Sequence, residues 1–187
     1  MRKICTILIV AIGLLAGTSR AQETITNLTE LEIFEAQTGT VIVKGAGQSG
    51  SLTAGAADFT VWFKESLNVS TGQKAYGVVI DISDNNRRVR KAVIDYDELD
   101  AFLSGLDYLA RIDYAVTTLP TFSAGYTTRS GFRVGAFTSE RRGAIQFFLQ
   151  AYNTDNTRIL ITPAQLAQFR TLIEQTRRSL DVLRTPH

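Results

Sequence analysis

The chain has 187 residues, of which 44% are hydrophobic and 20% charged, with 20 Lys and Arg, 18 Asp and Glu, one Cys, one His and three Pro. This composition is typical of an ordinary globular domain. It excludes a collagen, a disordered acidic chain, a disulfide-stapled miniprotein and a protein with many membrane spans.

The first 21 residues have the features of a secretory signal peptide in the usual order. Arg2 and Lys3 precede an apolar run over residues 4–15, and Ser19-Arg20-Ala21 then places small residues where a signal peptidase reads them. The apolar run is too short for a membrane span, which takes about 20 residues. We therefore expect cleavage after about Ala21 and a secreted or periplasmic mature protein, residues 22–187, with no stable membrane anchor.

Cleavage changes the chemistry that the chain can support. Three of the 20 basic residues leave with the leader and none of the 18 acidic ones, so the mature protein has 17 against 18 and no overall attraction for nucleic acid. Cys5 leaves too, and the only histidine is the last residue, His187. A Ser/His/Asp triad, a Cys/His pair and a zinc site of the usual ligands are therefore excluded, and we expect no cofactor and no metal.

An internal repeat at an offset of 67 residues organises the mature chain. In each copy a strand end leads to a capping box, Asp95 with Glu98 in the first and Thr162 with Gln165 in the second. The register continues into two amphipathic helices, although two such helices can also share this spacing by chance. The aligned apolar residues are Leu99, Phe102 and Leu106 in the first helix and Leu166, Phe169 and Ile173 in the second.

Upstream of each helix the apolar period changes to two, which predicts half-buried strands. The connections between them are short, and this permits hairpins but excludes parallel crossovers. We predict an α+β fold made of two repeats, about 31–112 and 120–183, each an antiparallel four-strand meander followed by one helix, fused in a single domain. The expected strands are 31–36, 40–44, 59–64, 78–83 and one ending at Ile94 in the first repeat, and 122–127, 132–137, 145–150 and one ending at Ile161 in the second.

The predicted arrangement, in which four strands followed by a helix occur twice, resembles in topology the Whirly and PC4-like folds that bind single-stranded DNA. The resemblance is at the level of topology, since the lysine-rich signature of that family is missing from the chain. It implies an arrangement of elements and carries no functional residue over to this sequence.

Residues 45–50, Gly-Ala-Gly-Gln-Ser-Gly, match the GxGxxG fingerprint of dinucleotide-binding loops. That fingerprint works only at the start of a helix inside a parallel strand, helix, strand unit. Only eight residues separate Gly50 from the strand expected at Phe59, too few for a helix of useful length. We interpret residues 45–50 as a mobile glycine-rich loop.

Carboxylates remain available for acid and base chemistry. Asp81, Asp95 and Asp97 could supply a pair of the kind that glycosidases use. The pattern favours a helix cap for Asp95 and a solvated strand position for Asp81.

The one basic cluster of the chain, Arg87-Arg88-Val89-Arg90-Lys91, runs into the strand ending at Ile94. Arginines beside aromatic rings on outward strand positions suit a flat or polymeric anionic ligand, although such residues can also protect sheet edges or fill a helix or subunit contact. The candidate ligand-binding residues are Trp62, Arg87, Arg88, Arg90, Arg133, Phe137, Arg141 and Phe148, with Tyr126, Arg129 and Arg142 beside them.

Three functions follow from these patterns. The first is a secreted or periplasmic noncatalytic protein that binds a protein or an anionic polymer, or assembles with its own copies, through the sheet face that the helices leave open. The second is a single-stranded nucleic-acid-binding module, which the topology and the basic cluster favour and the export signal and mature charge oppose. The third is a hydrolase that uses carboxylates alone.

Overall fold

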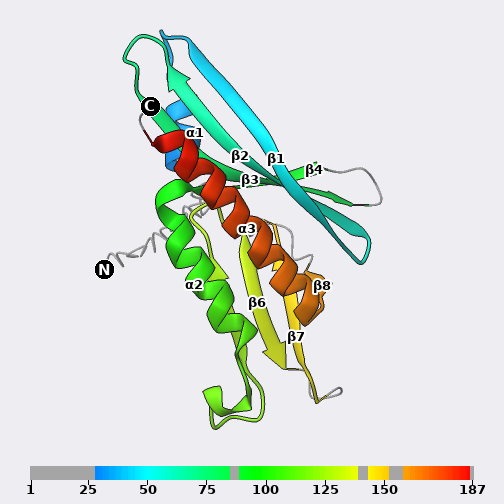
Figure 1. Ribbon diagram of the computed structural model, residues 1–187. Coiled ribbons are helices and arrows are strands. Elements are labelled where there is room, and N and C mark those ends of the chain that lie inside the picture. Colours follow the sequence, from blue (N-terminus) through cyan, green and yellow to red (C-terminus); the bar gives the residue numbers. More distant parts are fainter. Residues whose placement is uncertain (1–27, 85–88, 139–142, 152–157, 186–187) are drawn as a thin grey trace, which may run out of the picture.

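The computed structural model describes residues 28–84, 89–138, 143–151 and 158–185 (Figure 1). The predicted signal peptide, residues 1–21, lies outside this part of the chain. The candidate residues Arg87, Arg88 and Arg141 lie outside it too, as do Arg142 and His187.

Two antiparallel sheets form the framework, and each is a meander whose strands pair in chain order. The first sheet comprises β1 (Ile42–Ala54), β2 (Ala57–Asn68), β3 (Lys74–Asp84) and β4 (Val89–Asp95). The second comprises β5 (Ser123–Thr127), β6 (Arg133–Thr138), β7 (Ile145–Gln150) and β8 (Ile159–Ile161). The predicted α+β fold with two four-strand meanders is confirmed.

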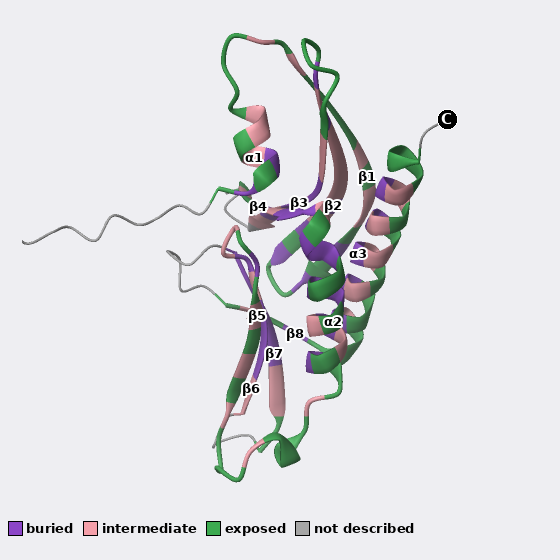
Figure 2. Cartoon of the chain, turned by 90° about the vertical axis from the view of Figure 1, so that its left-hand side faces the viewer, coloured by how far each residue is buried: buried purple, intermediate pink, exposed green. Residues whose placement is uncertain are grey.

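One long helix follows each meander. A 3-10 turn (Tyr96–Glu98) leads from β4 into α2 (Leu99–Ala110), and β8 leads into α3 (Pro163–Arg184). Both helices lie on the same side of the two sheets (Figures 1 and 2). A second 3-10 turn (Tyr114–Val116) lies between the two halves. We call the face of each sheet that points away from α2 and α3 its outer face.

The repeated apolar stripe builds the core, as its register predicted. Leu99, Phe102, Leu106, Leu166, Phe169 and Ile173 are all buried, and they join one continuous core with the inward strand residues of both halves. Phe102 and Phe169, which occupy the same position in the two repeats, face each other with their ring centroids 6.3 Å apart. The two copies therefore pack on each other through equivalent residues.

The two predicted capping boxes have different outcomes. Thr162 and Gln165 form theirs at the start of α3, as predicted. Asp95 makes no cap on its own helix and instead accepts hydrogen bonds from the backbone N–H groups of Glu30 (2.8 Å) and Leu31 (3.0 Å). The prediction for Asp95 and Glu98 is wrong because a helix from the start of the chain reaches Asp95 and takes its carboxylate.

That helix, α1 (Glu30–Glu35), replaces the strand expected over residues 31–36. A complete capping box between Thr29 and Glu32 starts it, and Leu31 is its buried residue. It lies on the outer face of the first sheet, where the Glu35 carboxylate binds Lys44, Lys64 and Ser66. The strand prediction is wrong because the cap and these contacts outweigh a short apolar alternation.

The glycine-rich segment 45–50 is also not a loop, contrary to our interpretation. It forms the middle of β1 and pairs with β2 through a bulge between Gln48 and Gly50. Gly47 leaves room for the Phe63 ring, since a Cβ at that position would meet ring carbon Cζ at 2.1 Å. The glycines therefore serve close packing inside an antiparallel sheet, and the described residues provide no helix after them for a dinucleotide.

Candidate functional site

The outer face of the second sheet brings three of the predicted ligand-binding residues together. Val134 and Ala136 of β6 point inward and are fully buried, so Arg133, Gly135 and Phe137 between them point outward. The register places Phe148 of β7 beside Gly135. Both α2 and α3 lie on the other side of this sheet (Figure 2).

Phe148 is the centre of this face. Its ring has arginines on two sides, with the guanidinium carbon of Arg158 4.8 Å and that of Arg133 5.7 Å from the ring centroid. The centroid of the Phe137 ring lies 6.0 Å from that of Phe148. The guanidinium carbon of Arg158 is also 5.7 Å from the Phe137 centroid. Both distances to Phe148 are within the range of a cation–π contact. We call Arg133, Phe137, Phe148 and Arg158 the arginine–phenylalanine patch.

Two glycines allow these large side chains to lie flat on the sheet. A Cβ at Gly135 would meet the Phe148 ring at 2.5 Å, and a Cβ at Gly125 would meet Arg133 Nε at 2.7 Å. Because neither Cβ exists, the ring and the guanidinium group rest directly on the backbone of β5 and β6. Phe148 is 0% exposed, although it points away from the helices. A ligand would therefore meet guanidinium groups and Phe137 first.

The patch carries positive charge that nothing in the sheet balances. None of the four strands contains an Asp or Glu. Among the described residues, neither Arg133 nor Arg158 forms an ion pair with a carboxylate. Nε of Arg133 is buried without a hydrogen-bond partner, so an anion would have to bind the terminal Nη groups of that guanidinium. A guanidinium group on an aromatic ring keeps its in-plane N–H donors available for an anion.

Arg129 shows the contrasting case of a neutralised arginine. Its guanidinium group binds Asp97, with Nη2 2.6 Å from Oδ2, and also Asp95 at 3.2 Å. The hydrogen bonds from Arg129 hold the pKa of the Asp97 carboxyl below its ordinary value, although partial burial opposes them. Arg129 therefore belongs to the structure that holds the start of α1, and it is not part of the patch.

The remaining predicted residues lie elsewhere. Trp62 is on the outer face of the first sheet, where the register places it between Gln48 and Val79. Arg90 is on the opposite, inner side of that sheet, in register with Ile82. Tyr126, expected to point outward, packs on Phe102 of α2 at 5.5 Å between ring centroids. The single surface expected from all these residues is thus divided over three places.

Arg158 is the member of the patch that sequence reasoning missed. It immediately precedes the short strand β8. The sequence did contain an indication of its position. Arg158 lies two residues before Leu160, so in an alternating strand both side chains point to the same face, and Leu160 is 49% exposed on the outer face. Extending the alternation backward by one step would have placed Arg158 beside Phe148.

The three candidate carboxylates lie in two different places. Asp95 and Asp97 share Arg129, and Asp81 lies on the outer face of the first sheet with Lys91 3.9 Å away. Burial raises the pKa of the Glu98 carboxyl, which accepts a hydrogen bond from the Arg129 backbone N–H at 3.0 Å. In the described parts of the chain, no cluster of His, Cys, Asp or Glu side chains is suited to hold a metal ion.

Two comparisons with known proteins were negative. No protein-family model matches the sequence, and the curated proteins include none that matches it. None of the helices in the described ranges combines the length and apolar character that a membrane span requires.

Proposed function

We propose that this protein is a noncatalytic binding protein of the periplasm or the extracellular space, and that the arginine–phenylalanine patch binds an anionic polymer. One observation carries the proposal: two arginines without a carboxylate partner in the described residues contact one phenylalanine on the outer face of a sheet whose strands contain no Asp or Glu. The proposed location outside the cytosol rests on the signal-peptide pattern of residues 1–21.

The chemistry of the patch suits carboxylate, sulfate or phosphate groups. Each guanidinium group can bind such an anion through two parallel N–H donors, which gives geometric selection as well as charge. The cation–π contacts hold both groups in place before the ligand arrives, so less side-chain freedom is lost on binding. Because both arginines contact the same Phe148 ring, a chain with repeated anionic groups can contact both at once.

The test compares charged and neutral polysaccharides on the mature protein, residues 22–187. We expect polygalacturonate and heparin to bind and dextran not to bind, with an affinity that falls as salt rises. Replacing both patch arginines, Arg133→Gln with Arg158→Gln, should weaken binding at least tenfold, because each charged hydrogen bond contributes about 1.5–3 kcal/mol. Calorimetry at two salt concentrations measures both effects.

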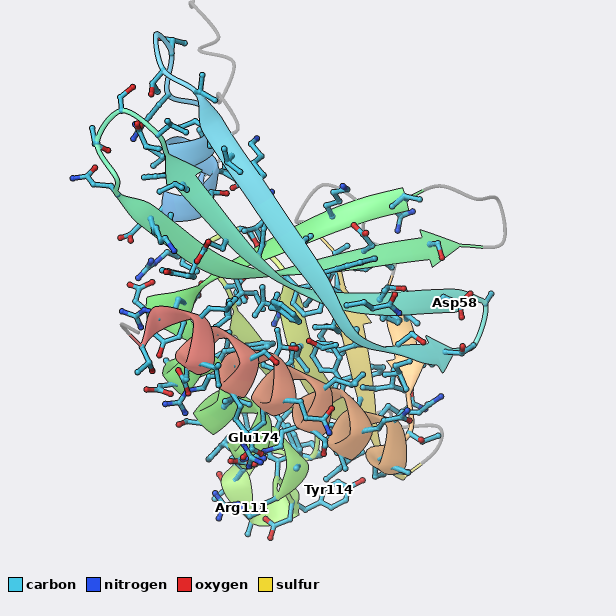
Figure 3. All side chains as sticks on the ribbon, turned by 45° about the horizontal axis from the view of Figure 1, so that its top comes forward. Asp58, Arg111, Tyr114 and Glu174 are labelled. Atoms are coloured by element: carbon cyan, nitrogen blue, oxygen red, sulfur yellow. The ribbon has the colours of Figure 1, made fainter. Side chains whose placement is uncertain are left out.

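The matched control removes two positive charges from the helix side of the molecule. Arg111 lies at the end of α2, and Arg178 of α3 pairs with Glu174 (Figure 3). Arg111→Gln with Arg178→Gln changes the net charge equally and should leave polymer affinity within about twofold, since exposed pairs contribute little. Equal losses in the two double variants would show that net charge alone drives binding, and the proposed site would be abandoned.

A single-stranded nucleic acid is the second candidate, favoured by one observation. Each half of the chain has the four strands followed by a helix that the Whirly-like topology also has. Binding of a single-stranded oligonucleotide at low salt, lost in the Arg133 and Arg158 double variant and steeply weakened by salt, would favour this candidate over a polysaccharide. No binding to the oligonucleotide at low salt would exclude it.

A further inference from the structure

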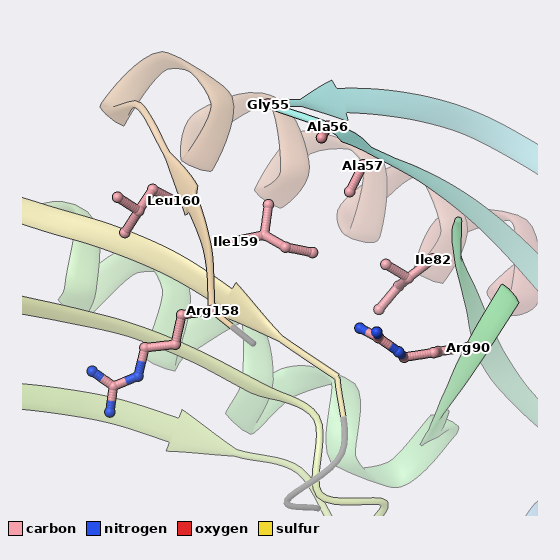
Figure 4. Close-up of a pocket in the computed structure, with 8 residues that line it drawn as sticks. All are labelled: Gly55, Ala56, Ala57, Ile82, Arg90, Arg158, Ile159 and Leu160. Atoms are coloured by element: carbon pink, nitrogen blue, oxygen red, sulfur yellow. The ribbon is translucent and has the colours of Figure 1, made fainter. Parts of the chain in front are cut away.

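A cleft of about 340 Å³ opens between the two sheets, on the opposite side of Arg158 from the patch. The turn between β1 and β2 forms one wall, together with Ile82 of β3, and the start of β8 forms the other (Figure 4). Its lining consists of Gly55, Ala56, Ala57, Ile82, Arg90, Arg158, Ile159 and Leu160.

The cleft exists because small residues face large ones across it. Gly55 has a positive φ of 59° in the tight turn, and Ala56 and Ala57 follow it, so this wall has almost no side-chain volume. Ile159 and Leu160 on the other wall remain accessible, and Leu160 is 49% exposed. Apolar groups that line such a space gain contacts when another apolar group fills it.

Among the lining residues, only Arg90 directs a charged group into the cleft. The guanidinium group of Arg90 points toward the space between Ile82 and Ile159, whereas that of Arg158 points away from it (Figure 4). Arg158 contacts the Phe137 and Phe148 rings of the patch instead. None of the lining residues is acidic. Arg90 already has an interaction partner within the chain, but a guanidinium group has five N–H donors and can bind a further anion.

We propose that this cleft binds a medium-chain alkyl carboxylate, with the alkyl chain between Ile82 and Ile159 and the carboxylate on Arg90. The apolar walls select the chain, and the single cationic group selects an anionic head over a neutral or cationic one. The volume is in the range of small-molecule sites. The proposal does not depend on the polymer function, since Ile82, Ile159 and Arg90, which carry it, lie outside the arginine–phenylalanine patch, and Arg158 alone belongs to both.

Calorimetric titration of the mature protein with hexanoate, octanoate and decanoate tests the apolar part. Each added methylene should tighten binding about fourfold per buried group until the cleft is filled. Decanol and decyltrimethylammonium have the same chain with a neutral and a cationic head, and both should bind at least tenfold more weakly than decanoate. Equal affinity for all three heads, or no dependence on chain length, would overturn the proposal.

Two variants locate the site. Arg90→Met removes the charge but keeps an apolar stem, and it should weaken decanoate about tenfold or more and abolish the preference for the carboxylate over decanol. Ala56→Phe adds a ring at an exposed turn position and should block all three ligands. Its control is Ser51→Phe, which adds the same ring on the outer face of β1. Unchanged decanoate affinity in Ala56→Phe, with the fold intact by circular dichroism, would overturn the assignment.

Discussion

The absence of a Cβ atom at two glycines decides how the arginine–phenylalanine patch is built. Phe148 lies over Gly135 and Arg133 lies over Gly125, so both large side chains rest flat on the backbone. This arrangement explains why a residue that points away from the helices is buried. It also makes the glycines part of the candidate site although they have no functional group.

Gly135→Ala should therefore destabilise the protein by about 1–3 kcal/mol, the usual cost of overpacking. The new Cβ would lie 2.5 Å from the Phe148 ring and 2.7 Å from the backbone oxygen of Ala124. The ring can rotate away, but the backbone oxygen cannot, so the strands β5 and β6 must separate slightly. Urea denaturation of the mature protein measures the change.

Gly45→Ala is the matched control, because its Cβ would have only one neighbour, the Glu65 backbone oxygen at 3.9 Å. Its stability should stay within about 0.5 kcal/mol of the original chain. If the two substitutions have the same effect, the close packing at Gly135 is not what holds the patch flat.

At the scale of elements, α1 is attached to the outer face of the first sheet at its two ends. Asp95 holds its first backbone N–H groups, and Glu35 at its last residue binds Lys44, Lys64 and Ser66. Six residues are too few for a helix that is stable alone, so these contacts determine whether α1 forms.

Glu35→Gln should loosen α1 in a manner that depends on pH. Burial alone would raise the pKa of the Glu35 carboxyl, but hydrogen bonds from Lys64, Ser66 and Lys44 outweigh it and hold the pKa below the ordinary 4.5. A carboxyl whose pKa is lowered by folding stabilises the native state above its unfolded pKa, and this stabilisation disappears as pH falls through the folded pKa. The variant should thus be less stable at pH 7, by about 1 kcal/mol because the group is partly exposed, and the difference should shrink as pH falls below 4.5 and the carboxyl is protonated.

Urea denaturation at several pH values measures this difference, and hydrogen exchange at Leu31 reports on α1 itself. Asp100→Asn is the control, because it breaks one exposed pair with Arg177 and touches no part of α1. It should leave the Leu31 exchange rate unchanged. A difference in stability between Glu35→Gln and the original chain that does not shrink as the pH is lowered would contradict the assignment to the carboxylate.

Periodicity predicted the elements whose packing is local, and it failed where distant residues decide. The alternation over 59–64, 78–83 and 145–150 places strands correctly because each strand buries one face on the core. For α1, the Thr29 and Glu32 capping box was present in the sequence, but its docking on Asp95 is a contact across more than 60 residues. The middle of β1 was misread as a loop because its glycines matter only once Phe63 lies against Gly47.

The same distinction applies to the candidate site. Arg133 and Phe137 have the same parity on one strand, so the sequence placed them together, and the meander brought Phe148 beside them. Arg90 shares its parity with the buried Ala92 and Ile94, which indicated an inward position that we did not use. The position of Trp62 relative to the patch could not be predicted, because it depends on how the two sheets pack around α2 and α3.

At the scale of the whole molecule, the two repeats are held together by their equivalent helices. Phe102 of α2 and Phe169 of α3 contact each other, and both also contact Phe132. The core residues of both halves form one cluster. The halves should therefore unfold as one cooperative unit.

A double-mutant cycle with Phe102→Leu and Phe169→Leu tests this coupling. Each substitution should cost about 1 kcal/mol, and their combined effect should differ from the sum by about 0.5–1.5 kcal/mol because the two rings lose the same contact. Phe102→Leu combined with Leu31→Ala is the control and should be additive, since Leu31 lies outside the shared core. A second measurement compares the unfolding of the two repeats directly. Fluorescence of Trp62, the only tryptophan, reports on the first repeat, and circular dichroism follows the helices of both repeats. The two urea transitions should coincide in every variant. Separate midpoints, or additive behaviour of the two phenylalanines, would mean that the repeats fold as independent halves that only touch.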